Sequence, residues 1–403
     1  MSVTAATGAP QLPSHLDPFR AENLDDPYPL YAQMRDLGPA VYCADRDVWF
    51  VSTYAAVLDV LRNYRAFVSG LGTSYIRVSD SGFRFPFIDN DPPEHTRVRR
   101  SVQRQFSRNT IEEMRPDVQS IVEQLLAAPV AQQHADVVSV LSRRLPDLTI
   151  RKLTGIEPPS SEKMADWADA VFHILGPDPD PRYLELTLES LDWLAAEGVP
   201  AMPAHCLGRN ILEQGGDSGA LAAEGTERLY ALASIWTAGV DTTNSLLSNM
   251  LYAFATNPDQ WDAVRADPSL ADQAVEEVLR WDSPIRVFLR RTTTETDLQG
   301  VTIPADANVC AMFPAANRDP SAFENADAFD VTAARKKTHV AFGASIHMCL
   351  GAPVARLEAV EVIRFLAKRV SRIELDGQPV RATSRVIRNF SYLPIRFVPA
   401  GER

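Results

Sequence analysis

The sequence predicts a mainly helical protein with small, dispersed β-sheets, in the α+β class and built as one large domain. Between residues 109 and 281, apolar residues recur with helical spacing in six segments, whereas strand-like runs are short and few. No Gly/Ser-rich linker, charge block or internal repeat divides the 403 residues. A hydrophobic fraction of 45% is enough for a single large core.

The order of the expected elements follows from periodicity and from breaking residues. A hairpin is expected over 40–43 and 48–52, with its turn at Asp45-Arg46-Asp47, and further strands at 301–303, 309–313 and 395–398. Alternating prolines at 177, 179 and 181 separate two helices. Residues 1–14, rich in Ala, Thr and Pro, are expected to form a disordered tail before a domain at 15–403. The expected helices are 26–37, 109–127, 137–153, 161–175, 182–198, 228–256 and 270–281.

Composition excludes several classes of function. A net charge of −12 argues against nucleic acid as a partner. Four cysteines without a CxxC pair favour a reducing, cytoplasmic setting without a disulfide framework or zinc site. No run approaches 18 apolar residues, so neither membrane spanning nor secretion is expected.

One cysteine, Cys349, follows a histidine in a loop of small residues that runs from Phe342 to Gly351 and precedes a helix-like run at 354–358. Backbone N–H groups and a helix N-terminus favour a thiolate, the form of cysteine that ligates iron. The alternative is a buried free cysteine beside a turn.

A second motif, Ala238-Gly239-Val240-Asp241-Thr242-Thr243, lies at the centre of the 228–256 helix. Glycine, an acid and two threonines have low helix propensity, and a threonine hydroxyl can bond a carbonyl one turn back. This predicts a helix interrupted by a local bulge. An ordinary helix with a polar stripe is the alternative.

A third motif pairs Glu277 with Arg280 on one helix face, just before Pro284 ends the helix. Glu94 and Arg97 have the same spacing, so the pair is informative only in its context, 274–280.

Taken in this order, the three motifs resemble those of soluble bacterial cytochromes P450, over essentially residues 15 to 403. The cysteine loop departs from the family pattern at Ser345, where glycine is usual. The resemblance implies the cytochrome P450 fold and a haem b whose iron is ligated by the thiolate of Cys349. It also implies a monooxygenase that inserts one oxygen atom from O2 into a C–H bond of a small molecule.

The resemblance also assigns roles to individual residues. Thr242 and Asp241 would be catalytic, in oxygen activation and proton delivery, and Glu277 and Arg280 would form a structural pair. The third partner of that pair is usually an arginine, here Ala328, so Arg318 or Arg335 is expected to replace it. Haem propionates need cations or hydrogen-bond donors. The residues implied to hold the haem are His95, Arg99, Arg290, Phe342, His347, Cys349 and Gly351.

Electrons are expected from a separate ferredoxin or flavodoxin-type donor with its NAD(P)H reductase, because this chain has no flavin or iron–sulfur motif. A basic patch near the cysteine would dock this acidic partner; scattered solubilising charges are the alternative. The residues expected in the patch are Arg97, Arg100, Arg104, Arg335, Lys336, Lys337 and Arg356.

The substrate is expected to be small, apolar and aromatic, methoxylated or phenolic, and to undergo hydroxylation or O-demethylation. The run 171–177 resembles P450s that demethylate para-methoxybenzoate-type acids. Those enzymes have an arginine where this chain has Gly70, so carboxylate recognition would need Arg84 or Arg286. Aromatic residues predicted near the access face include Tyr75, Phe83 and Phe85. The pocket is expected to include Phe87, Phe172, Leu175, Ala238, Val287, Phe288 and Phe390.

Two other functions are open on the sequence. One is a peroxygenase that uses hydrogen peroxide directly, and the other is a non-catalytic recruitment module with the same fold. The intact Asp241–Thr242 pair disfavours both. Ser345 is expected either to adopt an ordinary backbone conformation or to strain the loop, because its Cβ disfavours glycine-only conformations.

Overall fold

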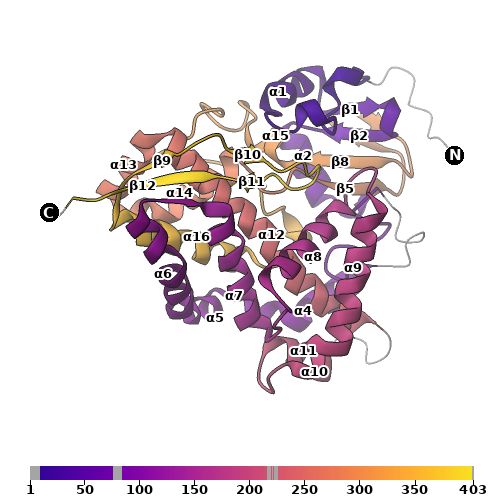
Figure 1. The fold of residues 1–403 in the computed structure, drawn as a ribbon. Helices are drawn as coiled ribbons and strands as arrows, with labels where there is room; N and C mark the ends of the chain where they lie inside the picture. The colour runs from indigo at the N-terminus through magenta and orange to yellow at the C-terminus, as the bar shows by residue number, and fades with distance from the viewer. Residues whose placement is uncertain (1–9, 76–83, 216–218, 220, 222–225, 402–403) are drawn as a thin grey trace.

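The computed structural model describes residues 10–75, 84–215, 219, 221 and 226–401. Helices make up most of it, and the long helix α12, Glu227–Thr256, runs through the centre (Figure 1). The other helices are α1 Tyr28–Leu37, α2 Tyr54–Arg62, α4 Glu94–Val102, α5 Arg108–Glu113, α6 Arg115–Gln132, α7 Arg144–Thr154, α8 Ser161–His173, α9 Pro181–Trp193, α10 Val199–Ala201, α11 Leu207–Gln214, α13 Pro258–Ala266, α14 Ala271–Trp281, α15 Phe313–Asn317 and α16 Ala352–Ala367.

Four small sheets accompany the helices. The largest has the order β1-β2-β8-β5-β3, and in it β2 and β8 are parallel while the other neighbours are antiparallel. The second has the order β4-β12-β9, and two hairpin-like pairs, β6-β7 and β10-β11, complete the set. The strands are β1 Ala40–Cys43, β2 Val48–Val51, β3 Phe67–Val68, β4 His134–Asp136, β5 Val287–Thr292, β6 Thr296–Leu298, β7 Val301–Ile303, β8 Asn308–Met312, β9 Val370–Leu375, β10 Val380–Arg381, β11 Phe390–Tyr392 and β12 Pro394–Pro399.

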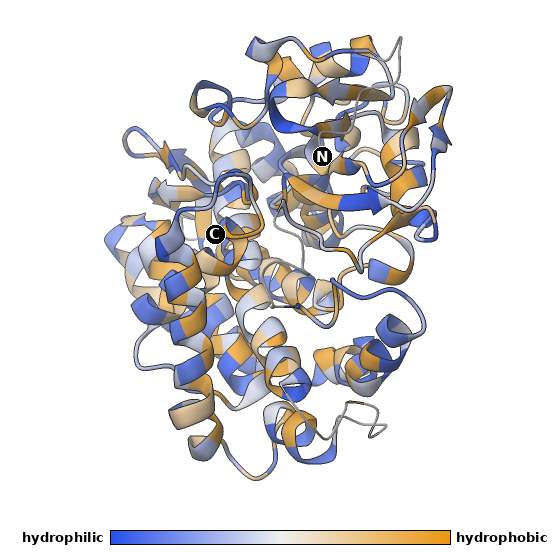
Figure 2. Cartoon of the chain, turned by 90° about the vertical axis from the view of Figure 1, so that its right-hand side faces the viewer, coloured by the Kyte–Doolittle hydropathy of each residue, from blue (hydrophilic) through white to orange (hydrophobic). Residues whose placement is uncertain are grey.

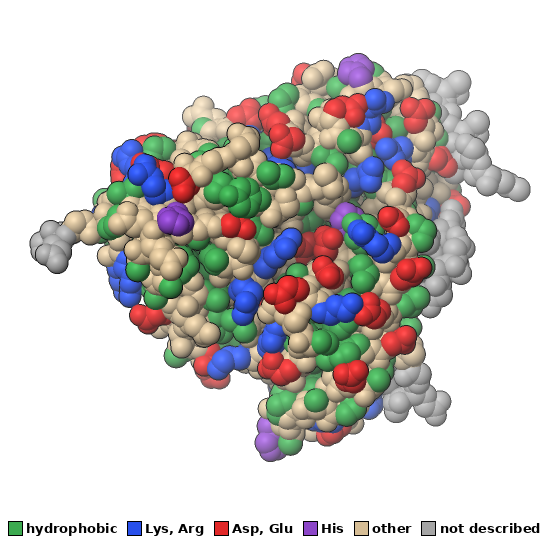
Figure 3. Space-filling view, in the orientation of Figure 1, with side chains coloured by type: hydrophobic (Ala, Val, Ile, Leu, Met, Phe, Trp, Pro, Cys, Tyr) green, Lys and Arg blue, Asp and Glu red, His purple; other side chains and the backbone are tan. Residues whose placement is uncertain are grey.

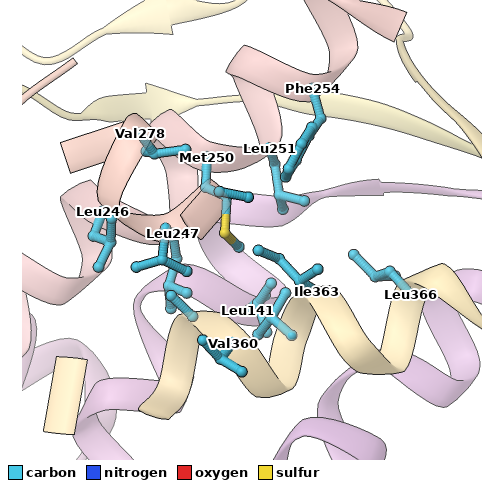
Figure 4. Packing of buried hydrophobic residues seen from close by; sticks show 14 of the residues in the cluster. Leu141, Leu246, Leu247, Met250, Leu251, Phe254, Val278, Val360, Ile363 and Leu366 are labelled. Atoms are coloured by element: carbon cyan, nitrogen blue, oxygen red, sulfur yellow. The ribbon is translucent and has the colours of Figure 1, made fainter. Parts of the chain in front are cut away.

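The main core forms where α12 packs against α16 and α14. Met250 of α12 and Ile363 of α16 point toward one another in this cluster, together with Leu141 from the turn before α7 (Figure 4). Each is at most 1% exposed, and full burial of such a side chain contributes about 1.5 to 3 kcal/mol. This packing holds α12 and α16 side by side; α12 contains the second motif, and the cysteine loop lies directly before α16.

The outer helices are striped with hydrophilic and hydrophobic residues, as helices with one buried face are (Figure 2). On the face seen in Figure 3, acidic and basic side chains are interspersed. No helix among the described residues has the length and apolar character needed to cross a membrane. Leu12, in the predicted tail, donates its backbone N–H to the Tyr42 carbonyl at 2.8 Å, so residues 10–14 lie against the first sheet; residues 1–9 lie outside the described residues.

The predicted fold class is confirmed, and most element boundaries agree within a few residues. The hairpin forms with Cys43 opposite Val48, and Asp47 takes a left-handed conformation in its turn. The helix predicted over 109–127 is wrong in one respect: it divides at Met114, because Pro116 favours a new helix start. The segments 137–153 and 182–198 are α-helical only in part, since 138–142 and 194–198 form π-helical turns.

Candidate active site

The cysteine loop is folded into a tight turn at the N-terminus of α16. The Cys349 N–H donates to the Phe342 carbonyl at 2.8 Å, and Gly351 directly precedes the helix. Burial raises the pKa of the Cys349 thiol, while the backbone N–H groups of Gly351 and Ala352 oppose this rise. The loop therefore has the helix-terminus setting that favours a thiolate.

Ser345 adopts φ +60°, in the left-handed region that favours glycine. Of the two outcomes expected for this residue, the structure has the strained one. A non-glycine residue there costs about 1 to 2 kcal/mol, because its Cβ approaches the carbonyl that follows.

Ser345→Gly is expected to raise the free energy of unfolding by about 0.5 to 1 kcal/mol. Relief of the strain exceeds the greater entropy that glycine has in the unfolded chain, which is about 0.5 to 1 kcal/mol. Urea unfolding of the two proteins measures the difference. Ser345→Ala keeps the Cβ and should show no gain, and a glycine variant no more stable than the parent would contradict the assignment of strain.

The second motif, residues 238–243, lies on the uninterrupted α-helix α12, so the predicted bulge is wrong. Thr242 donates its hydroxyl to the Ala238 carbonyl at 2.8 Å without breaking the helix. A Cβ at Gly239 would lie 3.2 Å from Cδ1 of Ile150, so glycine allows α7 to approach α12 closely. Ala238, Gly239 and Thr242 line a cavity that Cys349 also lines.

Asp241 points away from this cavity, into a buried polar pocket. Its Oδ1 accepts from the side-chain amides of Asn244 and Asn389 at 3.1 and 3.2 Å, and it is 6% exposed. Oδ2 has no hydrogen-bond partner among the described residues. Burial, followed by the charge of Asp169 on α8, raises the pKa of Asp241 to about 6. A carboxyl with such a pKa can both take up and release a proton near neutral pH.

Four basic residues predicted to hold the haem lie close together: Arg99, Arg290 and His347 line the cavity, and His95 packs behind His347. His95 and His347 pack with ring centroids 4.3 Å apart, and neither ring nitrogen of His95 has a partner among the described residues. Burial and the charge of Arg99 lower the pKa of His95 to about 4, and burial lowers the pKa of Arg290 to about 10. Unpaired buried cations are costly unless an anion compensates them. The residues present therefore fit a cofactor with two carboxylates at its edge.

The predicted structural pair forms and has a third partner. Arg280 binds Glu277 through two contacts at 2.8 and 2.7 Å, and Arg335 binds the same carboxylate at 2.8 Å. Of the two replacements expected for Ala328, Arg335 is therefore the one found. Arg318 instead lies 3.5 Å from the Tyr28 ring and 4.5 Å from the Trp281 ring.

Five of the seven predicted pocket residues line the cavity, namely Phe87, Phe172, Leu175, Ala238 and Phe288. Val287 does not, because successive strand residues face opposite sides and Phe288 and Arg290 face the cavity. Phe390 does not, because it packs against Tyr252 with centroids 5.0 Å apart.

Of the other aromatic residues predicted near the access face, some line the cavity and some do not. Phe85 lines the cavity, as does Phe313, which sequence reasoning missed. Tyr75 packs against Phe19 instead, and Phe83 lies outside the described residues. At Gly70, a Cβ would lie 2.6 Å from Oδ2 of Asp91, whose carboxylate accepts the Gly70 N–H.

A cavity that runs between α12 and the cysteine loop, lined also by Arg99 and Arg290, is the arrangement expected of a haem-thiolate protein. Three comparisons agree with this class. The family model described as Cytochrome P450 matches residues 224–375. The chain is 32% identical to "Cytochrome p450 CYP199A2" of Rhodopseudomonas palustris, covering 98% of this chain and 96% of that protein. It is 34% identical to "Cytochrome P450 monooxygenase PikC" of Streptomyces venezuelae, covering 92% and 91%.

Solved structures show the same likeness. The ligand-free structure of Mycobacterium smegmatis CYP164A2 matches with a TM-score of 0.83 and 28% identity, over 94% of this chain and 98% of that one. The chain belongs to the cytochrome P450 family. It is therefore a haem monooxygenase, which uses O2, a small-molecule substrate and electrons from a redox partner.

Proposed function

We propose that this chain oxidises a small, uncharged aromatic substrate, by hydroxylation or O-demethylation, with Cys349 as the iron ligand and a ferredoxin-type electron donor. The observation that supports this most is a single cavity lined by Cys349, Thr242 and aromatic side chains. The haem, when bound, activates dioxygen and delivers one oxygen atom to the substrate.

Residues of the chain would bind the haem, shape the cysteine loop and deliver protons. When haem is bound, His95, Arg99, Arg290 and His347 would hold its propionates, and Phe342 and Gly351 would shape the loop around the cysteine. Thr242 lines the cavity; because its hydroxyl donates to the Ala238 carbonyl, Oγ1 can accept a hydrogen bond from a proton-bearing group in the cavity. Asp241, behind it on α12, takes up protons from the α8 side and passes them toward the cavity.

The cavity wall favours an uncharged substrate. The hydroxyls of Ser234 and Thr237 donate to carbonyls of their own helix at 2.6 and 2.8 Å. Arg84 bonds Asn90 and Arg286 bonds the Leu24 carbonyl, so neither is placed to bind a carboxylate in the cavity. Among the described lining residues the cations are Arg99 and Arg290, which belong to the propionate end. A carboxylate elsewhere in this cavity would be buried without a partner.

Spin-state titration with two ligands of matched shape tests the substrate class. We expect 4-methoxytoluene to shift the haem spectrum and 4-methoxybenzoate to bind about 100-fold more weakly, because an unpaired buried charge costs several kcal/mol. Phe172→Leu should weaken the neutral ligand, whereas Phe390→Leu, outside the cavity, should leave its affinity unchanged. Equal or tighter binding of the acid would exclude the uncharged class.

The proposed docking surface is the hollow beside the cysteine loop, lined by Arg99, Arg100, Arg104, Arg356 and Met348. Met348 is 52% exposed and supplies an apolar centre. Three cations predicted for docking are paired within the chain: Arg97 with Glu227, Arg335 with Glu277 and Arg356 with Glu276. Arg100 and Arg104 therefore supply the main attraction for an acidic donor.

The double charge reversal Arg100→Glu with Arg104→Glu is expected to slow reduction by a ferredoxin about tenfold or more at low salt, and less at high salt, because steering is electrostatic. Stopped-flow reduction measures this rate. Lys368→Glu with Arg369→Glu, at two exposed positions just beyond the C-terminal end of α16, changes the charge by the same amount and is the matched control. If both variants slowed reduction equally, the proposed surface would be wrong.

A further inference from the structure

Glu358 of α16 is a buried carboxyl group that the mechanism above does not use. It lines the same cavity as Cys349 and Thr242, is 1% exposed, and its Oε1 has no hydrogen-bond partner among the described residues. The hydroxyl of Thr149 on α7 lies beside the carboxyl. That hydroxyl donates its one hydrogen to the Leu145 carbonyl at 2.9 Å, so in this arrangement it can only accept from Glu358. The contacts of Glu358 therefore fit its protonated, uncharged form.

Among the described residues, no charged group compensates this carboxyl. On α7, Asp147 is paired with Arg151 at 2.6 Å. On α16, Glu361 is paired with Arg364 at 3.0 Å and with Arg115 of α6. The charged residues that share the cavity are Arg99 and Arg290, at the propionate end. Burial raises the pKa of Glu358 to about 8, even though the neighbouring Thr149 hydroxyl opposes the rise.

We propose that in alkaline solution, where Glu358 is ionised, it binds a proton in step with reduction of the haem, an inference that rests on the proposed function. The step takes one electron from the redox partner and one proton from solvent. The electron reduces ferric to ferrous iron, and the proton forms an O–H bond on the Glu358 carboxylate. No bond of the substrate changes. The added negative charge in the cavity disfavours the carboxylate, so proton uptake keeps the charge of the cavity constant.

This coupling is reciprocal, so it is visible in the reduction potential. If reduction favours protonation of Glu358, protonation must favour reduction by the same factor. Below the pKa of Glu358 the acid is already protonated and contributes no pH dependence. Above it, reduction requires proton uptake, and the reduction potential falls as pH rises.

Spectroelectrochemical titration of the haem-loaded protein between pH 7 and 9, away from the pKa values of Asp241 and Arg290, tests the proposal without reference to turnover. The parent protein is expected to have a reduction potential that falls above about pH 8, with a slope approaching 59 mV per tenfold change in proton concentration for one electron. Glu358→Gln, which has nearly the same shape, should have a flat potential over this range. Glu358→Asp retains a titratable group and should retain a slope, and Glu113→Gln, an exposed control on α5, should behave as the parent.

A flat potential in the parent, or the same slope in Glu358→Gln as in the parent, would overturn the proposal. The test is separable from the proposed function, because each protein is first checked for the spectrum of a thiolate-bound haem. Absence of that spectrum in the parent would count against the ligand assignment. A normal spectrum with no loss of slope in Glu358→Gln would count against Glu358 alone.

Discussion

Cys349→Ala is expected to abolish the absorption band of the reduced carbon-monoxide complex that is typical of thiolate-bound haem, and with it monooxygenation. The side chain is exposed to the cavity, so its removal leaves no hole in the core. The fold should therefore persist while the thiolate ligand is lost. Difference spectroscopy of the reduced protein with carbon monoxide measures the band.

The other cysteines provide the control for this result. Cys43 and Cys310 lie in strands β1 and β8, where burial raises the pKa of each thiol. Cys206 caps α11, where its sulfur accepts the Arg209 N–H at 3.3 Å. Because Cys206 is outside the cavity, Cys206→Ala should keep the band. An unchanged band in Cys349→Ala would contradict the ligand assignment.

The central helix shows how far local pattern predicts this fold. Its predicted range, 228–256, differs by one residue from α12, because a long apolar periodicity is a strong helix signal. The bulge predicted at residues 238–243 is absent because helix propensity is a weak indicator that tertiary packing overrides. Gly239 serves the close approach of Ile150, a contact between helices about 90 residues apart in sequence, which local pattern does not contain.

The candidate site likewise contains residues that the sequence could predict and residues whose place depends on tertiary packing. The family resemblance predicted Cys349, Thr242, Ala238 and Arg290 as site residues, and all four line one cavity. It also predicted His95, which does not line the cavity but packs against His347. The strand alternation that removes Val287 from the cavity was available in the sequence, given that Phe288 was assigned to it. The packing of Phe390 on Tyr252 was not available, since it depends on tertiary structure. Glu358 was missed because a glutamate within a helix pattern usually indicates solvent exposure.

Asp241→Asn is expected to lower turnover about 100-fold while leaving the haem spectrum unchanged, because a general acid typically contributes a factor of about 10² to 10⁴. The asparagine keeps the shape beside Asn244 and Asn389 but has no acidic proton to deliver. Product formed per electron consumed separates this defect from slow reduction. Normal coupling and turnover in Asp241→Asn would contradict the role of this acid.

The pH dependence of turnover tests the same role of Asp241, because this role predicts the direction in which the rate changes with pH. If the protonated form of Asp241 is needed, the rate should fall as pH rises through its pKa, which burial and the charge of Asp169 raise to about 6. Asp169→Asn removes a negative charge that raises this pKa, so the fall should move to lower pH. Asp166→Asn, an exposed acid on the same helix, should leave the profile unchanged. A shift to higher pH in Asp169→Asn would show that Asp241 is not the group that titrates. The direction of the shift thus tests the proton path from α8 to α12 independently of the size of the rate loss.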